Sequence, residues 1–282
     1  MSSSVSPSQT IPAFEPLPAL HLPRPLRLGV TSFVYPADIL PNVRALASAV
    51  DDIELVFFEA SEGANLPSAD DVQELADVAG THDLTYTIHF PIDKALGSES
   101  ATEREALLEQ IVRVVDLARP LDPFGWVMHV GGIGAGASSD RRRQWQDDAM
   151  PLLDRIDRHI GAPDRVCVEN LDYPFEWCDP FLERFRFAVC LDAGHLWQGG
   201  YDWRAHVARY LATTRVIHLY GTGRGTSHLS LAALPRPLIV EFLRSIVGFA
   251  GVLTIETFGE DNTRTSLERL AECLSIVHAT DA

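Results

Sequence analysis

The sequence predicts a single-domain (β/α)8 TIM barrel that follows a flexible N-terminal leader. Eight short apolar runs alternate with eight amphipathic stretches, and the units repeat at a spacing of about 30 residues. The length of 282 residues fits one such barrel, because barrels of this kind commonly reach about 250 residues. An open doubly wound sheet is the alternative, but such sheets rarely contain eight regular units.

Residues 1–26 are predicted to form the leader, and residues 27–282 the barrel. The leader, MSSSVSPSQTIPAFEPLPALHLPRP and Leu26, is rich in Ser and Pro, and proline opposes regular structure. It lacks a basic segment followed by an apolar one, so it does not read as a secretory signal.

The eight apolar runs are rich in Val, Ile, Thr and aromatic residues, as in strands that are buried on both faces. They are LGVTSF (28–33), IELVFFE (53–59), TYTIHF (85–90), WVMHV (126–130), RVCVEN (165–170), FAVCLDAGH (187–195), RVIHLYG (215–221) and GVLTIETF (251–258).

The stretches between these runs carry apolar residues at helical spacing. Ser68 is suited to the start of one predicted helix and Gly161 to the end of another. The helices are predicted at 37–50, 68–80, 101–119, 138–161, 179–185, 202–212, 236–248 and 262–279. The fifth is short and is interrupted by Pro174 and Pro180, which makes it the least regular unit.

Composition excludes several classes of protein. With 46% hydrophobic residues the chain can bury a core, and no run of roughly 18 apolar residues predicts a membrane span. A net charge of −16 weighs against a nucleic-acid partner, so a small-molecule substrate is expected. Lys94 is the only lysine, which leaves one candidate for Schiff-base chemistry. Four cysteines without a C-x-x-C pair suggest reduced thiols and a cytoplasmic location.

Ionisable residues stand at the carboxyl ends of seven consecutive predicted strands. In such barrels these ends form one rim, where the active site lies. The rim residues are Glu59, His89, His129, Glu169, Asp192, His195, His218 and Glu256, with His228 in a following loop. One such residue in an apolar strand is usually a core residue, but a whole series is costly to bury without a compensating charge. The series therefore predicts a site for a divalent metal ion.

Other residues near the rim give weaker signals for substrate binding. Arg224 lies between two candidate ligands in HLYGTGRGTSH, where contact with an anion and exposure to solvent are equally plausible. Lys94 follows HFPID and is a lesser candidate for the same role, and Glu59 and His228 are candidates by position. Cys167 and Cys190 lie within strands and are predicted to be core thiols.

Taken together, these motifs resemble the xylose-isomerase-like barrel superfamily, which includes AP endonuclease family 2 enzymes and sugar epimerases. The resemblance covers about residues 27–278 and rests on His89, His129, VEN, D-x-x-H, His218 and IET. More narrowly, LGVTSFVYPADILPNVRALASAVDDIELVFFE, HDLTYTIHFPID and HLSL look like the cobamide-remodelling phosphodiesterase branch.

The resemblance implies a set of ligands for one or two ions of Zn or Mn. The first metal would be bound by Glu169, Asp192, His218 and Glu256. His89 and His129 would join Glu169 at a second metal, as in endonuclease-like members. A third metal there uses His195 with an Asp and a His, but Thr226 and Ser227 precede His228 here, so the Asp is missing.

Two reactions are consistent with this ligand set. The first is metal-dependent hydrolysis of a phosphodiester, and the narrower resemblance implies the phosphoribosyl linkage in the nucleotide loop of cobamides. The alternative is isomerisation or epimerisation of a sugar or sugar phosphate, with Glu169 and Glu256 as acid and base and His195 at the substrate. Cleavage of abasic DNA ranks lower because the protein is acidic, and a barrel that only binds a ligand would not need a complete ligand set.

Overall fold

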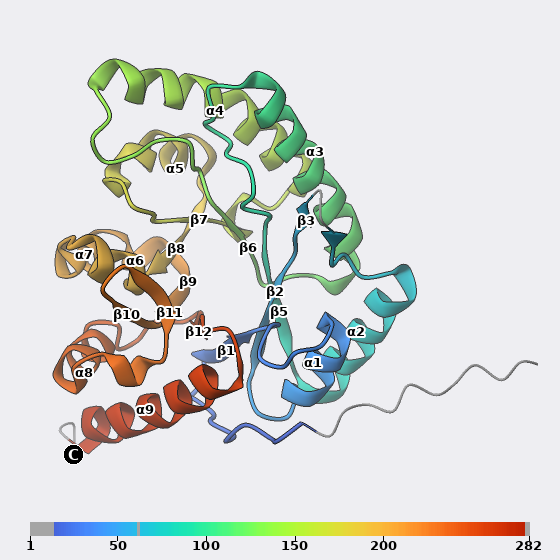
Figure 1. Ribbon diagram of the computed structural model, residues 1–282, viewed down its shortest axis with the longest axis vertical. Helices are drawn as coiled ribbons and strands as arrows, with labels where there is room; N and C mark the ends of the chain where they lie inside the picture. Colours follow the sequence, from blue (N-terminus) through green and yellow to red (C-terminus); the bar gives the residue numbers. More distant parts are fainter. Residues whose placement is uncertain (1–13, 61–62, 280–282) are drawn as a thin grey trace, which may run out of the picture.

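The computed structural model describes residues 14–60 and 63–279 and shows a closed barrel of eight parallel strands (Figure 1). The strands are β1 (Arg27–Thr31), β2 (Asp52–Val56), β5 (Thr85–His89), β6 (Gly125–Met128), β7 (Val166–Glu169), β8 (Ala188–Asp192), β9 (Thr214–Leu219) and β12 (Val252–Ile255). They follow one another around the barrel in chain order, and β12 closes it against β1. The predicted fold class is confirmed, and each predicted strand overlaps one of these eight.

Helices follow the strands and surround the barrel (Figure 1). The eight helices that the sequence predicted are α1 (Ile39–Leu46), α2 (Ala69–His82), α3 (Ala101–Ala118), α4 (Ser139–Ile160), α5 (Asp179–Phe185), α7 (Trp203–Tyr210), α8 (Arg236–Ser245) and α9 (Glu260–Ala279). Ser68 caps α2, since its side chain accepts a hydrogen bond from the Asp71 amide, and Gly161 ends α4 at φ 72°. Within the described part of the chain, no helix is long and apolar enough to cross a membrane.

Two predicted strands, 53–59 and 187–195, are too long at their carboxyl ends. β2 ends at Val56, and Glu59 belongs to β3, the first strand of a short hairpin. β8 ends at Asp192, and the next residues form α6 (Ala193–Gly199), which the sequence analysis missed. The Asp192 side chain caps this helix by accepting a 2.6 Å hydrogen bond from the His195 amide. The apolar spacing of so short a helix does not separate it from the strand before it, so periodicity alone could not find it.

Shorter elements decorate both ends of the barrel. Two hairpins, β3 (Glu59–Ala60) with β4 (Gly63–Ala64) and β10 (Gly221–Gly223) with β11 (Thr226–Leu229), follow β2 and β9. Single 3-10 turns are found at η1 (Arg119–Leu121), η2 (Pro163–Arg165), η3 (Phe175–Cys178), η4 (Leu211–Thr213) and η5 (Leu231–Ala233). The β10–β11 hairpin matters for function because it carries His228.

The barrel interior is apolar on one side and polar on the other. Val127, Cys167, Ala188, Cys190 and Val216 form a separate buried cluster. Several of these stand two residues before a rim residue, so they lie one layer below it on the same face of the strand. The opposite side holds fully buried polar residues, namely Asp52, Glu54, Thr87 and Thr254. The prediction that Cys167 and Cys190 are core thiols is confirmed.

Residues 14–26 contain no helix or strand, but they lie against the barrel. Leu17 and Leu22 are buried, and the Phe14 ring stacks on Tyr35 with 4.3 Å between ring centroids. The Tyr35 hydroxyl also donates a 2.6 Å hydrogen bond to the Glu15 carbonyl. This half of the predicted leader therefore packs as part of the molecule, whereas residues 1–13 lie outside the described residues.

Candidate metal centre

The structure brings together the six residues predicted as metal ligands. His89, Glu169 and Asp192 are the last residues of β5, β7 and β8, and His218 is the next-to-last residue of β9. His129 and Glu256 directly follow their strands. Parallel pairing places Asp192 beside His218, and Glu169 beside Cys190. The six side chains therefore meet at the carboxyl end of the barrel.

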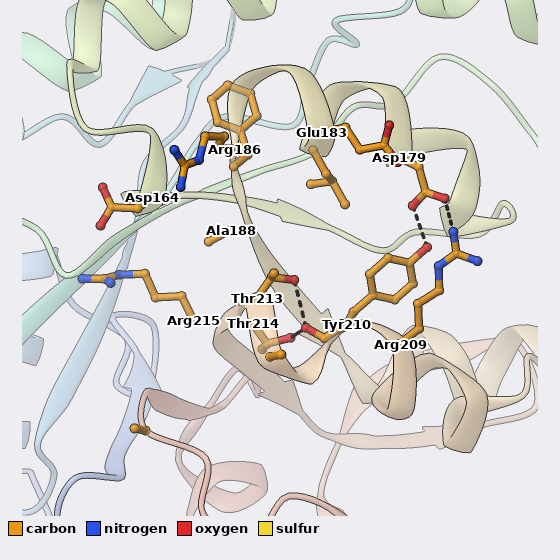
Figure 2. Close-up of a pocket in the computed structure, with 14 residues that line it drawn as sticks. Asp164, Asp179, Glu183, Arg186, Ala188, Arg209, Tyr210, Thr213, Thr214 and Arg215 are labelled. Carbon is orange, nitrogen blue, oxygen red and sulfur yellow. Dashed lines mark hydrogen bonds and ion pairs between the residues drawn. The ribbon is translucent and has the colours of Figure 1, made fainter.

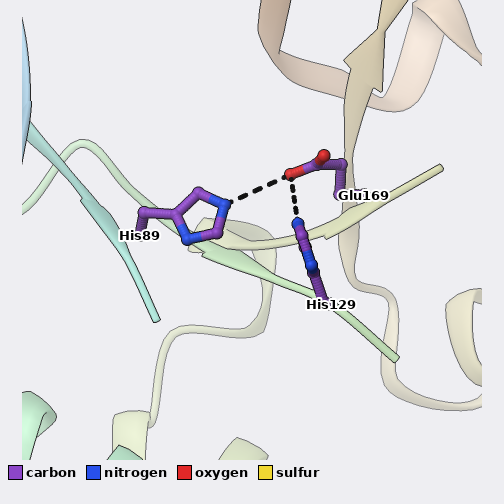
Figure 3. Close-up of side chains that lie close together, drawn as sticks. All are labelled: His89, His129 and Glu169. Carbon is purple, nitrogen blue, oxygen red and sulfur yellow. Dashed lines mark ion pairs between the residues drawn. The ribbon is translucent and has the colours of Figure 1, made fainter. Parts of the chain in front are cut away.

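Glu169 lies at the centre of the group and is 1% exposed. Its Oε2 atom is 3.4 Å from His89 Nε2 and 3.1 Å from His129 Nε2 (Figure 3). On its other side, Oε1 is 3.3 Å from His195 Nδ1. One carboxylate thus faces imidazoles from the ends of β5 and β6 and from α6.

His218 Nδ1 marks a second meeting point. It lies 3.2 Å from Glu256 Oε2, 3.6 Å from Glu169 Oε2 and 3.8 Å from Asp192 Oδ2. Three carboxylate oxygens from three strands therefore surround one ring nitrogen. This is the set that the family resemblance implied for the first metal.

The same four atoms are buried and, among the described residues, have no hydrogen-bond partner. They are Glu169 Oε2, Asp192 Oδ2, His218 Nδ1 and Glu256 Oε2. Buried polar atoms nearly always have a hydrogen-bond partner, and buried carboxylates need a compensating positive charge. Three oxygens and one imidazole nitrogen suit Mn²⁺ or Zn²⁺. The residues present therefore fit a divalent metal.

A second possible ligand group is formed by His89, His129 and Glu169, whose ligand atoms lie within 4.8 Å of one another. Glu169, Asp192 and His195 form another such group. Glu169 belongs to both and is placed to bridge two ions.

The electrostatics of the cluster favour bound positive charge. Burial lowers the pKa of His89, but Glu169 and the neighbouring Glu54 and Glu256 outweigh burial and raise that pKa to about 9. The pKa of His195 is raised to about 10 in the same way, by Asp192 and Glu169 against burial. Burial alone would raise the pKa of Glu169, yet the adjacent imidazoles hold it well below its usual range. In the metal-free protein, protons supply the positive charge that a cation can supply instead.

The candidate catalytic and substrate residues His195 and His228 stand at the edge of this cluster. His195 Nδ1 is 3.0 Å from the Asn170 carbonyl, and His228 Nδ1 is 3.0 Å from the Glu256 carbonyl. His228 has a φ of 55°, a backbone conformation that non-glycine residues rarely adopt and that often marks functional sites. Both rings are partly exposed, so they can contact a molecule bound at the carboxyl end of the barrel.

Three predicted substrate-binding residues are not brought to the cluster by any described contact. Arg224 is exposed at the tip of the β10–β11 hairpin, and Lys94 pairs with Asp93 in the loop after β5. The side chain of Glu59 lies outside the described residues. Their roles stay predictions.

Three residues that the sequence did not single out lie in or beside the cluster. Glu54 accepts a hydrogen bond from His218, and Asn170 pairs with the Asp192 backbone through two hydrogen bonds of 2.8 and 2.9 Å. The Tyr220 ring lies 4.2 Å from that of His228, and its buried hydroxyl has no described partner. The sequence does contain a signal for Glu54. Asp52 and Glu54 are two residues apart, so they lie on the same face of an otherwise apolar strand.

A cavity of about 670 Å³ lies at the opposite end of the barrel (Figure 2). Its walls include residues at the starts of β8 and β9, such as Ala188 and Thr214, and side chains of α5 and α7. Asp179 is tied there to Arg209 and to the Tyr210 hydroxyl. Because the metal ligands stand at the other ends of the same strands, this cavity is separate from the metal centre.

Comparisons with known proteins agree with this geometry. No curated protein sequence matches the chain. Among solved structures, a D-tagatose 3-epimerase-like protein has 21% identity and a TM-score of 0.72, covering 91% of this chain and all of that one. D-psicose 3-epimerase from Clostridium cellulolyticum H10 has 15% identity and a TM-score of 0.63, with 90% and 98% covered.

AP endonuclease family 2 from Brucella melitensis has 17% identity and a TM-score of 0.62, with 87% and 98% covered. At these identities the likeness shows the fold alone. The sequence profile described as xylose isomerase-like TIM barrel matches residues 43–274, which is most of the chain. The chain therefore belongs to the xylose isomerase-like TIM barrel family.

Proposed function

We propose that this protein is a divalent-metal-dependent enzyme that acts on a small molecule at the carboxyl end of its barrel. The observation that carries the proposal is the convergence of four buried ligand atoms, without a described hydrogen bond, from Glu169, Asp192, His218 and Glu256. A cation held there supplies Lewis acidity, polarising carbonyl or phosphoryl oxygens and making water more acidic.

The first candidate reaction is isomerisation or epimerisation of a sugar or sugar phosphate. Several structures that share the fold are named as ketose 3-epimerases, which supports this candidate over hydrolysis. Glu169 and Glu256 come from well-separated strands, β7 and the end of β12, and both approach His218 Nδ1. Carboxylates on two sides of one substrate carbon can remove a proton from one face and return a proton to the other.

In this reaction the remaining histidines would position the sugar. His195 and His228 border the cluster and are partly exposed, so their ring nitrogens can donate hydrogen bonds to hydroxyl groups.

The second candidate is hydrolysis of a phosphodiester, and one specific observation favours it. His89 and His129 both direct Nε2 at Glu169 Oε2, which builds a second ligand group that a one-metal epimerase does not need. Two divalent ions offset the charge of a phosphodiester better than one. The motifs that resemble the cobamide-remodelling branch suggest the phosphoribosyl linkage of a corrinoid as the substrate.

Cleavage of DNA at abasic sites ranks below both. The AP endonuclease among the structural neighbours shares the fold, but this chain carries a net charge of −16. That charge repels a duplex unless local arginines offset it.

Metal content and substrate panels distinguish the candidates. The purified protein is loaded with Mn²⁺ or Zn²⁺, its bound metal is counted by mass spectrometry, and it is assayed with ketoses, coenzyme B12 and an abasic oligonucleotide. One tightly bound ion with conversion of a ketose supports the epimerase. Two ions with cleavage of the corrinoid support the hydrolase. A protein that binds no divalent metal contradicts both.

A further inference from the structure

His218 has both ring nitrogens engaged, and they face different groups. Nδ1 points into the metal centre, whereas Nε2 lies 2.8 Å from Glu54 Oε2. Both side chains are completely buried. Glu54 stands on β2 and His218 on β9, and β1 and β12 separate these strands around the barrel. The hydrogen bond therefore crosses the barrel interior directly below the rim.

This contact determines which nitrogen of His218 can bind a metal. A neutral imidazole carries one N–H, and only the other nitrogen has a lone pair to offer. When Nε2–H donates to Glu54, the lone pair is on Nδ1, the nitrogen that faces Glu169, Asp192 and Glu256. A carboxylate behind a ligating histidine also makes the ring a stronger ligand and fixes its orientation.

The other imidazoles of the cluster are oriented differently in the described structure. His89 Nδ1 is 2.9 Å from the Phe90 carbonyl, and His195 Nδ1 is 3.0 Å from the Asn170 carbonyl. Among the described contacts of these histidines, only His218 has a carboxylate beside the ring nitrogen that faces away from the metal centre. Its side chain is also the most deeply buried of the three.

We propose that Glu54 is a positioning residue of the metal centre, which sets the tautomer and orientation of His218 so that Nδ1 receives the metal. The inference rests on the metal site of the proposed function, but not on which reaction occurs there. Glu54, His218 and Glu256 also have ligand atoms within 4.8 Å of one another, and Glu54 Oε1 has no described hydrogen bond. Because Glu54 Oε2 is engaged by His218 Nε2, we assign Glu54 to the histidine and not to the ion.

Asp52 provides a matched control. It stands two residues earlier on the same strand, faces the same interior and is also completely buried. Its Oδ2 accepts a hydrogen bond from the Thr85 hydroxyl, and no described contact joins it to a metal ligand. Asp52→Asn and Glu54→Gln therefore make the same chemical change one layer apart.

The test is metal affinity, measured by titrating the metal-free protein with Mn²⁺ and following the free ion by electron paramagnetic resonance. Glu54→Gln should raise the Mn²⁺ dissociation constant by about 10- to 100-fold, the usual effect of removing such a partner. Asp52→Asn should change it by less than about threefold. Equal affinity of Glu54→Gln and the unmodified protein would overturn the positioning role alone. An unmodified protein that binds no Mn²⁺ would overturn the metal site itself.

A second measurement needs no variant, so it decides the question even if Glu54→Gln does not fold. In the Zn²⁺-loaded protein, nitrogen-15 spectra of the histidine rings should show one metal-bound imidazole that binds through Nδ1 and keeps a slowly exchanging Nε2 proton. If every metal-bound imidazole binds through Nε2, the proposed orientation of His218 is wrong.

Discussion

Glu169 connects more of the site than any other residue. Its two oxygens face opposite groups, with His89 and His129 on the Oε2 side and His195 on the Oε1 side. Oε2 also lies 3.6 Å from His218 Nδ1, so Glu169 would belong to both ligand groups if two ions bind. Whether the second ion binds is therefore decided by the histidines, which makes them the most informative residues to change.

Replacing His129 with Ala tests the second ligand group. If His89, His129 and Glu169 hold an ion, the variant should lose about one bound metal per chain, and hydrolysis of a phosphodiester should fall by roughly 10²-fold or more. Metal counting and turnover of coenzyme B12 measure the two effects.

His159→Ala is the matched control for this experiment. His159 pairs with Asp116 on the outside of the barrel, 2.8 Å away, so its loss should leave metal content unchanged. If His129→Ala also binds as much metal as the unmodified protein, the second group is not a metal site, and the single-metal epimerase gains support.

Replacing Glu256 with Gln tests the acid–base pair. The change keeps the shape of the side chain but removes its charge and its ability to accept a proton. We expect turnover of the ketose or phosphodiester substrate to fall by roughly 10²- to 10⁴-fold. Glu241→Gln, which affects an exposed ion pair with Arg204, should leave turnover unchanged. Full activity of Glu256→Gln would exclude Glu256 from catalysis.

At the scale of elements, strands were easier to predict than the short pieces that follow them. β8 and its neighbours are apolar on both faces, so composition alone identifies them. α6 was not predicted because it has only seven residues and begins directly after Asp192, which is both the last residue of β8 and the cap of the helix. The β10–β11 hairpin escaped as well, and with it the backbone conformation of His228. Short elements depend on tertiary contacts that a periodic pattern does not contain.

Burying Asp52 on β2 lowers the free energy of unfolding at neutral pH. Burial raises the pKa of Asp52 from 3.8 to about 7, despite hydrogen bonds from Thr85 and Thr87. Between these two pKa values the unfolded chain has lost a proton that the folded chain keeps. The free energy of unfolding therefore falls as the pH rises through this window, and the cost is complete above about pH 7.

Asp52→Asn should remove this cost. The free energy of unfolding of the variant, minus that of the unmodified protein, should increase by about 3 kcal/mol from pH 5 to pH 8. Each of the two pH units between pH 5 and the folded pKa of about 7 contributes about 1.4 kcal/mol to this increase. Urea denaturation at both pH values, with metal removed, measures the difference. A difference that does not change with pH would show that Asp52 ionises normally in the folded protein.

At the scale of the whole molecule, the topology explains why so much of the site could be predicted. Parallel strands that close into a barrel bring every carboxyl end to one rim, so six predicted ligands far apart in the chain had to meet. The direction of each side chain could not be predicted in the same way. That His218 turns Nε2 to Glu54, and that Arg224 extends from a hairpin tip, depends on packing across the barrel and on loop geometry.

The net charge of −16 also has a different meaning at the rim than on the outside. Many outer carboxylates are paired with arginines, as Glu105 is with Arg155 and Glu241 with Arg204. The rim carboxylates face imidazoles instead. These imidazoles can release a proton and bind a metal ion in its place. The acidity of the surface opposes a duplex, whereas the rim can attract cations.

This exchange predicts that metal binding tightens as the pH rises. In the metal-free protein the pKa of His89 is raised to about 9, and that of His218 is also raised, because Glu54, Glu256 and their neighbours outweigh the effect of burial. Below these values each ring holds a proton that must leave before the ring can bind a metal. For each proton released, affinity should rise about tenfold per pH unit, or about 1.4 kcal/mol.

The stabilisation that a saturating concentration of Mn²⁺ gives to the folded protein should follow the same rule, since a ligand stabilises in proportion to the logarithm of its concentration over the dissociation constant. The rise in melting temperature on adding Mn²⁺ should therefore be several degrees larger at pH 8 than at pH 6. His129→Ala should reduce the dependence on pH if His89 titrates as part of the second ligand group. An equal rise at both pH values would mean that the imidazoles are already neutral before the metal arrives, and that the carboxylates of the rim alone determine its affinity.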